Sequence, residues 1–90
     1  MKGITMTKVE IYTWETCPFC RRAKELLDAK DVDYKEYMIQ GDDEARDKMA
    51  ARANGRRTVP QIFIDDQWIG GCDDMHLLEA EGKLDKLLCA

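Results

Sequence analysis

The sequence lacks the features that mark nucleic-acid-binding, membrane-spanning and secreted proteins. Its 14 Lys and Arg are outnumbered by 18 Asp and Glu, which gives a net charge of −4, so no basic face for nucleic acid is expected. No apolar run approaches the roughly 18 residues that cross a membrane. Residues 1–8 contain no apolar stretch of about 7–15 residues, as a secretory signal would. We therefore expect a cytoplasmic protein with no role at a membrane or on nucleic acid.

Cysteine and histidine are also scarce, which limits metal and disulfide chemistry. The chain has four cysteines and one histidine, fewer cysteines than a disulfide-stapled secreted scaffold carries. A zinc site would require a second close cysteine pair or two histidines, whereas Cys72 and Cys89 lie far apart and His76 stands alone. No metal site is predicted. Cys72 and Cys89 receive no catalytic role, and His76 is expected on a helix surface.

The hydrophobic periodicity predicts one α/β domain with the element order βαβαββαα. Strands are expected at residues 8–13, 32–39, 61–64 and 67–69, and helices at 18–30, 44–53, 74–80 and 84–88. The strand–helix–strand start implies a right-handed crossover and a parallel pair, and a hairpin at Asp65-Asp66 adds antiparallel strands. The result is a mixed four-stranded sheet flanked by helices. This domain covers residues 8–88, with an N-terminal extension at 1–7 and a tail at 89–90.

Acidic residues are expected to cap two of the helices. Asp42 or Asp43 is the predicted N-cap of the 44–53 helix, and Asp73 or Asp74 that of the 74–80 helix. The apolar stripe of the 44–53 helix is thin, and it consists of Ala45, Met49 and Ala53. This helix is therefore expected at the periphery of the domain.

The segment Cys17-Pro18-Phe19-Cys20 carries the chemistry that the sequence predicts most directly. A strand that leads into a helix puts Cys17 at the helix N-terminus, where free N–H groups and the helix dipole stabilise a thiolate. Cys20 follows one turn later, shielded but close enough to attack a mixed disulfide on Cys17. A structural disulfide closing so short a loop would contribute only about 2 kcal/mol. Thiol–disulfide exchange with Cys17 as the nucleophile is the prediction; half a zinc site or two inert thiols are the alternatives.

Two further segments could bind a ligand. A proline at position 60 that leads into an edge strand leaves the backbone of Val59 free to pair with an extended ligand. In the segment 70–74, Gly-Gly-Cys-Asp-Asp, N–H groups at a helix N-terminus can hold a carboxylate, and the neighbouring acids can hold an ammonium. An α-amino acid end would satisfy both. Taken alone, each segment is equally an ordinary strand entrance or a turn with a helix cap.

Together these segments resemble the dithiol glutaredoxins, especially the small bacterial glutaredoxin 3 class. The resemblance covers residues 8–88 and is carried by Tyr12-Thr13, Cys17-Pro18-Phe19-Cys20, the run 58–64 (Thr-Val-Pro-Gln-Ile-Phe-Ile) and the run 69–74 (Ile-Gly-Gly-Cys-Asp-Asp). It implies a thioredoxin fold, a cis peptide bond before Pro60 and glutathione as co-substrate, with no tightly bound cofactor. The expected partners are glutathionylated proteins and disulfide-containing clients, met by a monomer.

The resemblance also implies a role for each matching residue. Cys17 would attack and form the mixed disulfide with glutathione, and Cys20 would resolve protein disulfides. The remaining positions would bind glutathione: Thr58, Val59 and Pro60 along the groove, and Gly71, Cys72 (by its backbone) and Asp73 (by its side chain) at the γ-glutamyl end.

Two positions depart from the family pattern. Phe19 stands where tyrosine is commonest, and Trp14 stands where a lysine is often found three residues before the first cysteine. If that lysine binds the glutathione carboxylate or tunes the thiolate, another cation must replace it. Arg57, then Arg21 or Arg56, are the candidates, while Trp14 would offer an apolar wall.

Two other functions fit parts of the same pattern. A redoxin fed by thioredoxin reductase shares the expected fold, but the 70–74 segment favours glutathione. An iron–sulfur carrier would bridge a cluster between two subunits through Cys17 and glutathione. Pro18 argues against this carrier, because related carriers usually have glycine there and lack the second cysteine.

Overall fold

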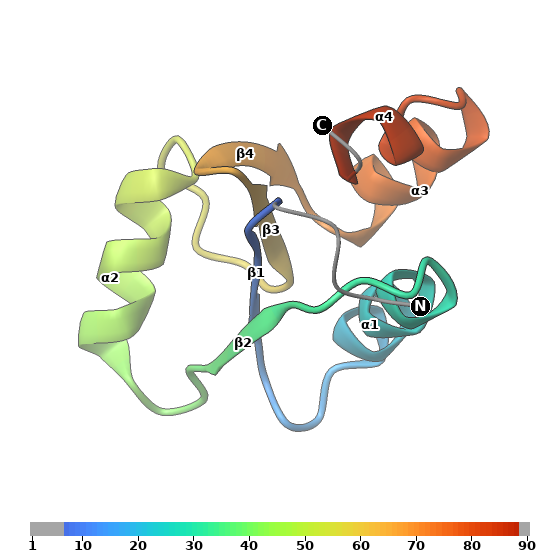
Figure 1. The fold of residues 1–90 in the computed structure, drawn as a ribbon. Coiled ribbons are helices and arrows are strands. Elements are labelled where there is room, and N and C mark those ends of the chain that lie inside the picture. Colours follow the sequence, from blue (N-terminus) through green and yellow to red (C-terminus); the bar gives the residue numbers. More distant parts are fainter. Residues whose placement is uncertain (1–6, 89–90) are drawn as a thin grey trace.

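The computed structural model describes residues 7–88 of the chain (Figure 1). The elements follow in the order β1 (Val9–Thr13), α1 (Pro18–Ala29), β2 (Lys35–Met38), α2 (Asp43–Arg52), β3 (Gln61–Ile64), β4 (Gln67–Gly70), α3 (Cys72–Ala80) and α4 (Leu84–Leu88). The predicted order βαβαββαα is confirmed. The predicted extension and tail, except for Thr7, lie outside the described residues.

The four strands form one mixed sheet in the order β2-β1-β3-β4. Strands β1 and β2 are parallel, while β3 runs antiparallel to both β1 and β4. Helices α1, α3 and α4 lie on one side of the sheet and α2 on the other (Figure 1). Because helices cover both faces, all five residues of β1 are buried. Its Val9 and Ile11 join the core under α1 and α3, and Tyr12 joins the core under α2.

Four expectations need correction. Strand β3, into which Pro60 leads, lies between β1 and β4 and is not an edge strand. Strand β2 begins at Lys35 rather than at residue 32, because the chain first turns at Asp31 (φ 57°). The Val32 side chain then enters the core, but its backbone does not pair with β1. Helix α2 is not peripheral, because the side chains of Met49 and Ala53 are completely buried against the sheet. The N-cap of α3 is Gly71, not Asp73 or Asp74.

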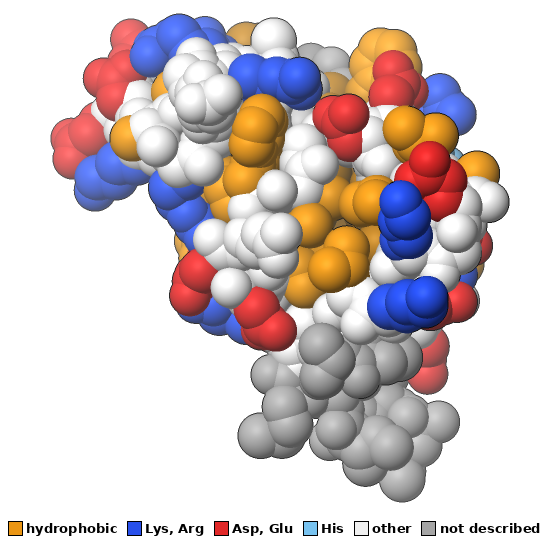
Figure 2. All heavy atoms as spheres, turned by 90° about the horizontal axis from the view of Figure 1, so that it is seen from above, with side chains coloured by type: hydrophobic (Ala, Val, Ile, Leu, Met, Phe, Trp, Pro, Cys, Tyr) orange, Lys and Arg blue, Asp and Glu red, His pale blue; other side chains and the backbone are white. Residues whose placement is uncertain are grey.

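Other local predictions are confirmed. Asp42 caps α2, because its carboxylate accepts a hydrogen bond of 3.0 Å from the Ala45 N–H. Asp65 and Asp66 form the turn between β3 and β4 with positive φ at both residues (52° and 66°), as a tight hairpin requires. On the face drawn in Figure 2, acidic and basic side chains intermix around apolar patches.

An ion pair fastens α2 to the centre of the sheet. Glu10 of β1 is 6% exposed, and its carboxylate accepts two hydrogen bonds from the Arg52 guanidinium, at 2.9 and 3.3 Å. The Tyr37 hydroxyl donates a third to Glu10, and Arg52 also donates to the Tyr12 hydroxyl. The guanidinium lies 4.0 Å from the centre of the Phe63 ring. These contacts, the Arg52 hydrogen bonds first, lower the pKa of Glu10.

Loss of Arg52 is expected to destabilise the fold in a pH-dependent way. Arg52→Met leaves the buried Glu10 carboxylate without its cation, which costs about 2–3 kcal/mol of unfolding free energy at pH 7. A lowered pKa stabilises the fold above the unfolded value and loses this contribution as the pH falls. The difference from the wild type should therefore shrink below about pH 4.3.

Urea unfolding at several pH values measures this difference. Lys48→Met is the matched control, because Lys48 forms an exposed pair of 3.6 Å with Glu44 on the same helix. Its cost should stay below about 0.5 kcal/mol. Equal stability of the two variants at pH 7 would contradict the proposed importance of the Glu10–Arg52 pair.

Candidate active site

The two cysteines of the 17–20 segment lie at the first turn of α1 in very different surroundings. Cys17 is the N-cap residue, and its Sγ accepts a hydrogen bond of 3.2 Å from the Cys20 N–H. Its thiol is partly exposed and lies 4.0 Å from the carbonyl oxygen of Val59. Cys20 is 1% exposed, as the sequence predicted. The arrangement presents one sulfur to an incoming disulfide and holds a second directly behind it.

Burial sets the protonation of Cys20. Desolvation, followed by the hydrogen bond with Cys17, raises the pKa of the Cys20 thiol to about 12. At neutral pH Cys20 is therefore a neutral thiol. Only a thiolate is an effective nucleophile. Cys20 therefore reacts only where a neighbouring group stabilises its thiolate or where the target sulfur lies very close.

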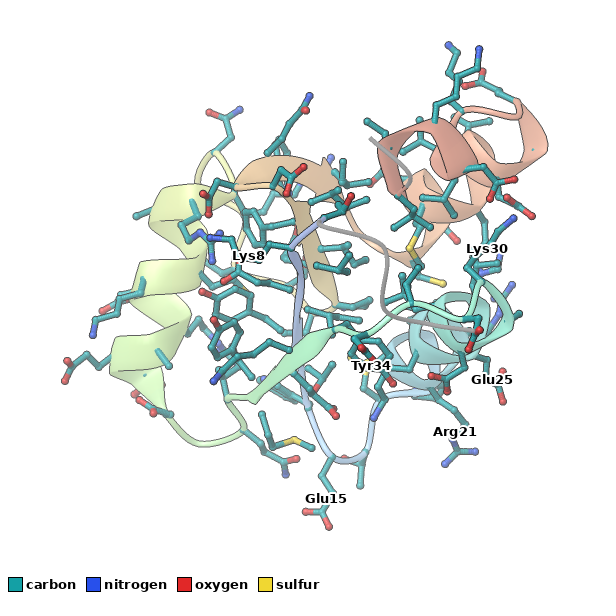
Figure 3. All side chains as sticks on the ribbon, viewed as in Figure 1. Lys8, Glu15, Arg21, Glu25, Lys30 and Tyr34 are labelled. Atoms are coloured by element: carbon teal, nitrogen blue, oxygen red, sulfur yellow. The ribbon has the colours of Figure 1, made fainter. Side chains whose placement is uncertain are left out.

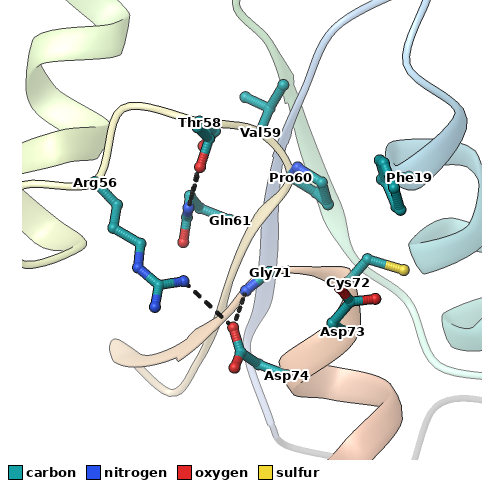
Figure 4. Close-up of a pocket in the computed structure, with 10 residues that line it drawn as sticks. All are labelled: Phe19, Arg56, Thr58, Val59, Pro60, Gln61, Gly71, Cys72, Asp73 and Asp74. Atoms are coloured by element: carbon teal, nitrogen blue, oxygen red, sulfur yellow. Dashed lines mark hydrogen bonds and ion pairs between the residues drawn. The ribbon is translucent and has the colours of Figure 1, made fainter.

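A groove runs from Cys72 past Pro60 toward Arg56, on the side of Cys17 where Val59 lies (Figure 4). Its lining comes from three parts of the chain and consists of Phe19, Arg56, Thr58, Val59, Pro60, Gln61, Gly71, Cys72, Asp73 and Asp74. The structure thus brings together six of the seven residues predicted to bind glutathione. The seventh, Arg57, is not among the lining residues and pairs with Asp47 at 2.8 Å.

The entrance to β3 forms one wall of the groove. The Val59–Pro60 peptide bond is cis, as the family resemblance implied. Buried Gln61 braces the preceding loop, because its amide donates to the Thr58 carbonyl at 3.1 Å. The Trp68 indole in turn donates to the Gln61 side chain at 2.8 Å. Sequence reasoning missed this brace, since nothing in the local pattern connects Trp68 with Thr58.

The N-terminus of α3 forms the opposite wall. Asp74 is not the N-cap residue, but from the N3 position its carboxylate accepts a hydrogen bond of 2.9 Å from the N–H of the N-cap residue Gly71, as in a capping box. Gly70 has φ +115°, and a Cβ there would collide with the Asp74 side chain. A Cβ on Gly71 would lie 3.2 Å from the Pro60 carbonyl oxygen. Two consecutive glycines are therefore needed to bring the helix end against the Pro60 wall.

One basic side chain reaches the groove. Arg56 extends from the loop before β3, pairs with Asp74 at 3.4 Å and stacks on Trp68 with 5.1 Å to the ring centre. Arg21 instead projects outward from α1 (Figure 3). Trp14 packs against the core under α2, and its ring is covered by Arg46 at 4.5 Å.

The other cysteines and the histidine have different surroundings. Cys72 is buried at the start of α3, and this burial raises the pKa of its thiol. His76 is half-buried rather than fully on the surface, and its Nε2 has no hydrogen-bond partner within residues 7–88. Cys89 lies outside the described residues. Among residues 7–88, no helix is both long and apolar enough to cross a membrane.

Comparison with known proteins agrees with this geometry. The glutaredoxin family model matches residues 9–69. The chain is 67% identical over 81 residues to a probable glutaredoxin of Synechocystis, covering 90% of this chain and 92% of the relative. It is 58% identical over 83 residues to glutaredoxin 3 of Escherichia coli K12, covering 92% and 99% of the two chains.

Solved structures give the same result. The solution structure of a glutaredoxin from Brucella melitensis is 48% identical with a TM-score of 0.82, covering 94% of this chain and 91% of that one. A crystal structure of a buckwheat glutaredoxin–glutathione complex is 28% identical with a TM-score of 0.84, covering 93% and 78%. The expected thioredoxin fold is confirmed by these neighbours.

Selective alkylation should separate the two thiols. With iodoacetamide at pH 7.5 (about one unit below the ordinary cysteine pKa), Cys17 should be modified while Cys20 stays unmodified, because Cys20 is buried and protonated. Peptide mapping by mass spectrometry measures both sites. The urea-unfolded protein is the control, where both cysteines should react at similar rates. Modification of Cys20 as fast as Cys17 in the folded protein would contradict the described asymmetry.

Gly70→Ala should distort the α3 wall. A side chain at positive φ costs about 1–2 kcal/mol, and the collision with Asp74 adds to this cost. Gly41→Ala is the matched control, because Gly41 also has positive φ (+79°) but open space around its Cβ position. Denaturant unfolding should show Gly70→Ala to be at least about 1 kcal/mol less stable than Gly41→Ala. Equal losses would mean that the Asp74 contact does not constrain position 70.

Proposed function

Since the chain belongs to the glutaredoxin family of thiol–disulfide oxidoreductases, we propose that it uses glutathione to reduce glutathione mixed disulfides and protein disulfides. The observation that carries this proposal is the first turn of α1. There the Cys17 sulfur accepts the Cys20 N–H at 3.2 Å, with the buried Cys20 thiol directly behind it. A location in the cytoplasm, where glutathione keeps thiols reduced, fits this function.

Cys17 carries the exchange with glutathione mixed disulfides. Its thiolate, stabilised by the N-terminus of α1, attacks the glutathione sulfur of a glutathionylated protein. A bond forms between Cys17 and glutathione, and the protein sulfur leaves with the electron pair as a thiolate. A second glutathione thiolate then attacks the glutathione bound to Cys17. This step releases the Cys17 thiolate and glutathione disulfide.

Protein disulfides require both cysteines. Cys17 attacks one sulfur of the client disulfide, and Cys20 then attacks Cys17, so that the client leaves as a dithiol. Two glutathione molecules afterwards reduce the Cys17–Cys20 disulfide. Glutaredoxin reduction potentials of about −200 to −230 mV lie in the range that cellular glutathione can reduce.

The groove suits a glutathione molecule along its length. The γ-glutamyl end is an α-amino acid, which fits the free N–H groups at the start of α3 and the exposed carboxylate of Asp73. The backbone of Val59, beside Cys17, can pair with the cysteinyl part. At the far end, Arg56 is the cation placed to meet the glycine carboxylate. The related buckwheat glutaredoxin is described as a complex with glutathione, which supports this assignment.

Two serine variants should separate the two reactions. Cys17→Ser should abolish turnover in both, because no nucleophile remains at the helix N-terminus. Cys20→Ser should retain reduction of glutathione mixed disulfides and lose reduction of protein disulfides, because only the second reaction needs a resolving thiol. Both are measured as NADPH oxidation coupled through glutathione reductase.

The two outcomes test different parts of the proposal. Wild-type protein without turnover in either assay would exclude glutathione as the reductant. Equal loss of both reactions in Cys20→Ser would contradict the division of labour between the cysteines.

A further inference from the structure

A polar cluster lies behind the Cys20 thiol, away from the glutathione groove. It consists of Lys24, Glu36 and Thr13, and we call it the Lys24 cluster. The Lys24 ammonium lies 2.9 Å from the Glu36 carboxylate, which also accepts a hydrogen bond of 2.6 Å from the Thr13 hydroxyl. Thr13 is completely buried, and the Lys24 and Glu36 side chains are 29% and 30% exposed. None of the three lines the groove.

Two features of the backbone bring this cluster to Cys20. Lys24 follows Cys20 by four residues on α1, so the two side chains share one face of the helix. The end of β1 links the two: the main chain of Trp14 favours the Cys20 thiolate, and the adjacent Thr13 donates its hydroxyl hydrogen to Glu36. The pair with Glu36 therefore holds the ammonium on the face of α1 that carries Cys20.

Lys24 and Cys17 act on the Cys20 sulfur in opposite directions. The charge of Cys17 acts on the Cys20 sulfur and opposes a second thiolate. The charge of Lys24 acts in the opposite direction and favours it. Lys24 itself faces Glu36 and Tyr34 as well as Cys20. Once Cys17 is bonded to a client, the opposition of Cys17 disappears and Lys24 remains.

We propose that Lys24 is a positioning residue for the resolving step, in which its ammonium stabilises the Cys20 thiolate that attacks the mixed disulfide on Cys17. The inference rests on the proposed function, because it concerns only the reaction that uses Cys20. Glu36 and Thr13 hold the ammonium in place, and the Glu36 carboxylate at the same time offsets part of its charge.

The step balances within the protein and its client. The Cys20 thiol loses its proton, and the resulting thiolate attacks the Cys17 sulfur. A bond forms between the two cysteine sulfurs while the bond between Cys17 and the client sulfur breaks. The client sulfur leaves with the electron pair and takes up a proton, so no external oxidant or reductant is needed.

An aromatic disulfide that releases a coloured thiolate, dithiobis(nitrobenzoate), isolates this step without glutathione. Added at one equivalent to the reduced protein, it releases a first coloured thiolate when Cys17 attacks and a second when Cys20 displaces the aromatic group from Cys17. Stopped-flow absorbance gives both rates in one experiment. Cys20→Ser should remove the second release and so identify it.

Lys24→Met should slow the second release and leave the first unchanged. A rise of one unit in the pKa of Cys20 leaves fewer thiolates, but each is a stronger nucleophile, so the net loss is roughly three- to fourfold. Lys24→Arg should restore most of the rate. Glu36→Gln should slow the second release less than Lys24→Met, because the amide keeps an acceptor for the Thr13 hydroxyl and the ammonium but no longer offsets the charge of Lys24.

Lys48→Met is the matched control for the loss of one lysine charge, and both its rates should equal those of the wild type. A second release that is unchanged in Lys24→Met would overturn the proposal. So would equal slowing in Lys24→Met and Glu36→Gln, because that result would show a structural role for the pair. Failure of the glutathione-coupled assay in the wild type would instead reject the proposed function, and the two failures are therefore distinguishable.

Discussion

The connection between β1 and α1 is the constraint on which the rest of the site depends. Strand β1 is central in the sheet and buried on both faces, so the point where it ends is fixed. The helix that follows begins at Pro18, which needs no hydrogen-bond partner for its nitrogen at this position. Cys17 therefore becomes the N-cap, and its sulfur takes the place of the side-chain oxygen that usually accepts from the first turn. The first turn of α1 thereby holds this sulfur at the surface.

The same helix turn produces the asymmetry between the two thiols. One turn of α1 separates Cys17 at the surface from Cys20 in the core, and this difference in burial is sufficient to keep Cys20 protonated. Two identical side chains thus acquire different reactivity from their environment alone. In the proposed resolving step, the Cys20 thiol would have to lose its proton inside the protein. A nearby cation would favour the loss of this proton, because its charge stabilises the thiolate.

The local sequence predicted the helices, the strands and the groove more completely than it predicted the ion pairs. The bounds of β3, the Asp42 cap and the Asp65-Asp66 turn follow from neighbouring residues, and the structure agrees with them. The Glu10–Arg52 ion pair joins residues 42 positions apart, so no local pattern could reveal it. For the same reason the sequence could not rank Arg56 above Arg57. Adjacent residues in a loop point in different directions, and only the tertiary structure shows which one meets Asp74.

Arg56, the cation proposed to bind the ligand carboxylate, is held in the groove by two weak contacts. Its pair with Asp74 is long, at 3.4 Å, and both side chains are about half exposed, so the pair contributes little to stability. Stacking on Trp68 restricts the guanidinium further at little electrostatic cost. A ligand carboxylate would therefore meet a guanidinium that is already oriented but only weakly neutralised. Asp74 has a second task, since the same carboxylate oxygen binds the Gly71 N–H and keeps the α3 wall in place. The Asp74 side chain thus contacts both Arg56 and the N-terminus of α3. Glycine at residue 70 leaves room for this side chain, because a Cβ there would collide with it.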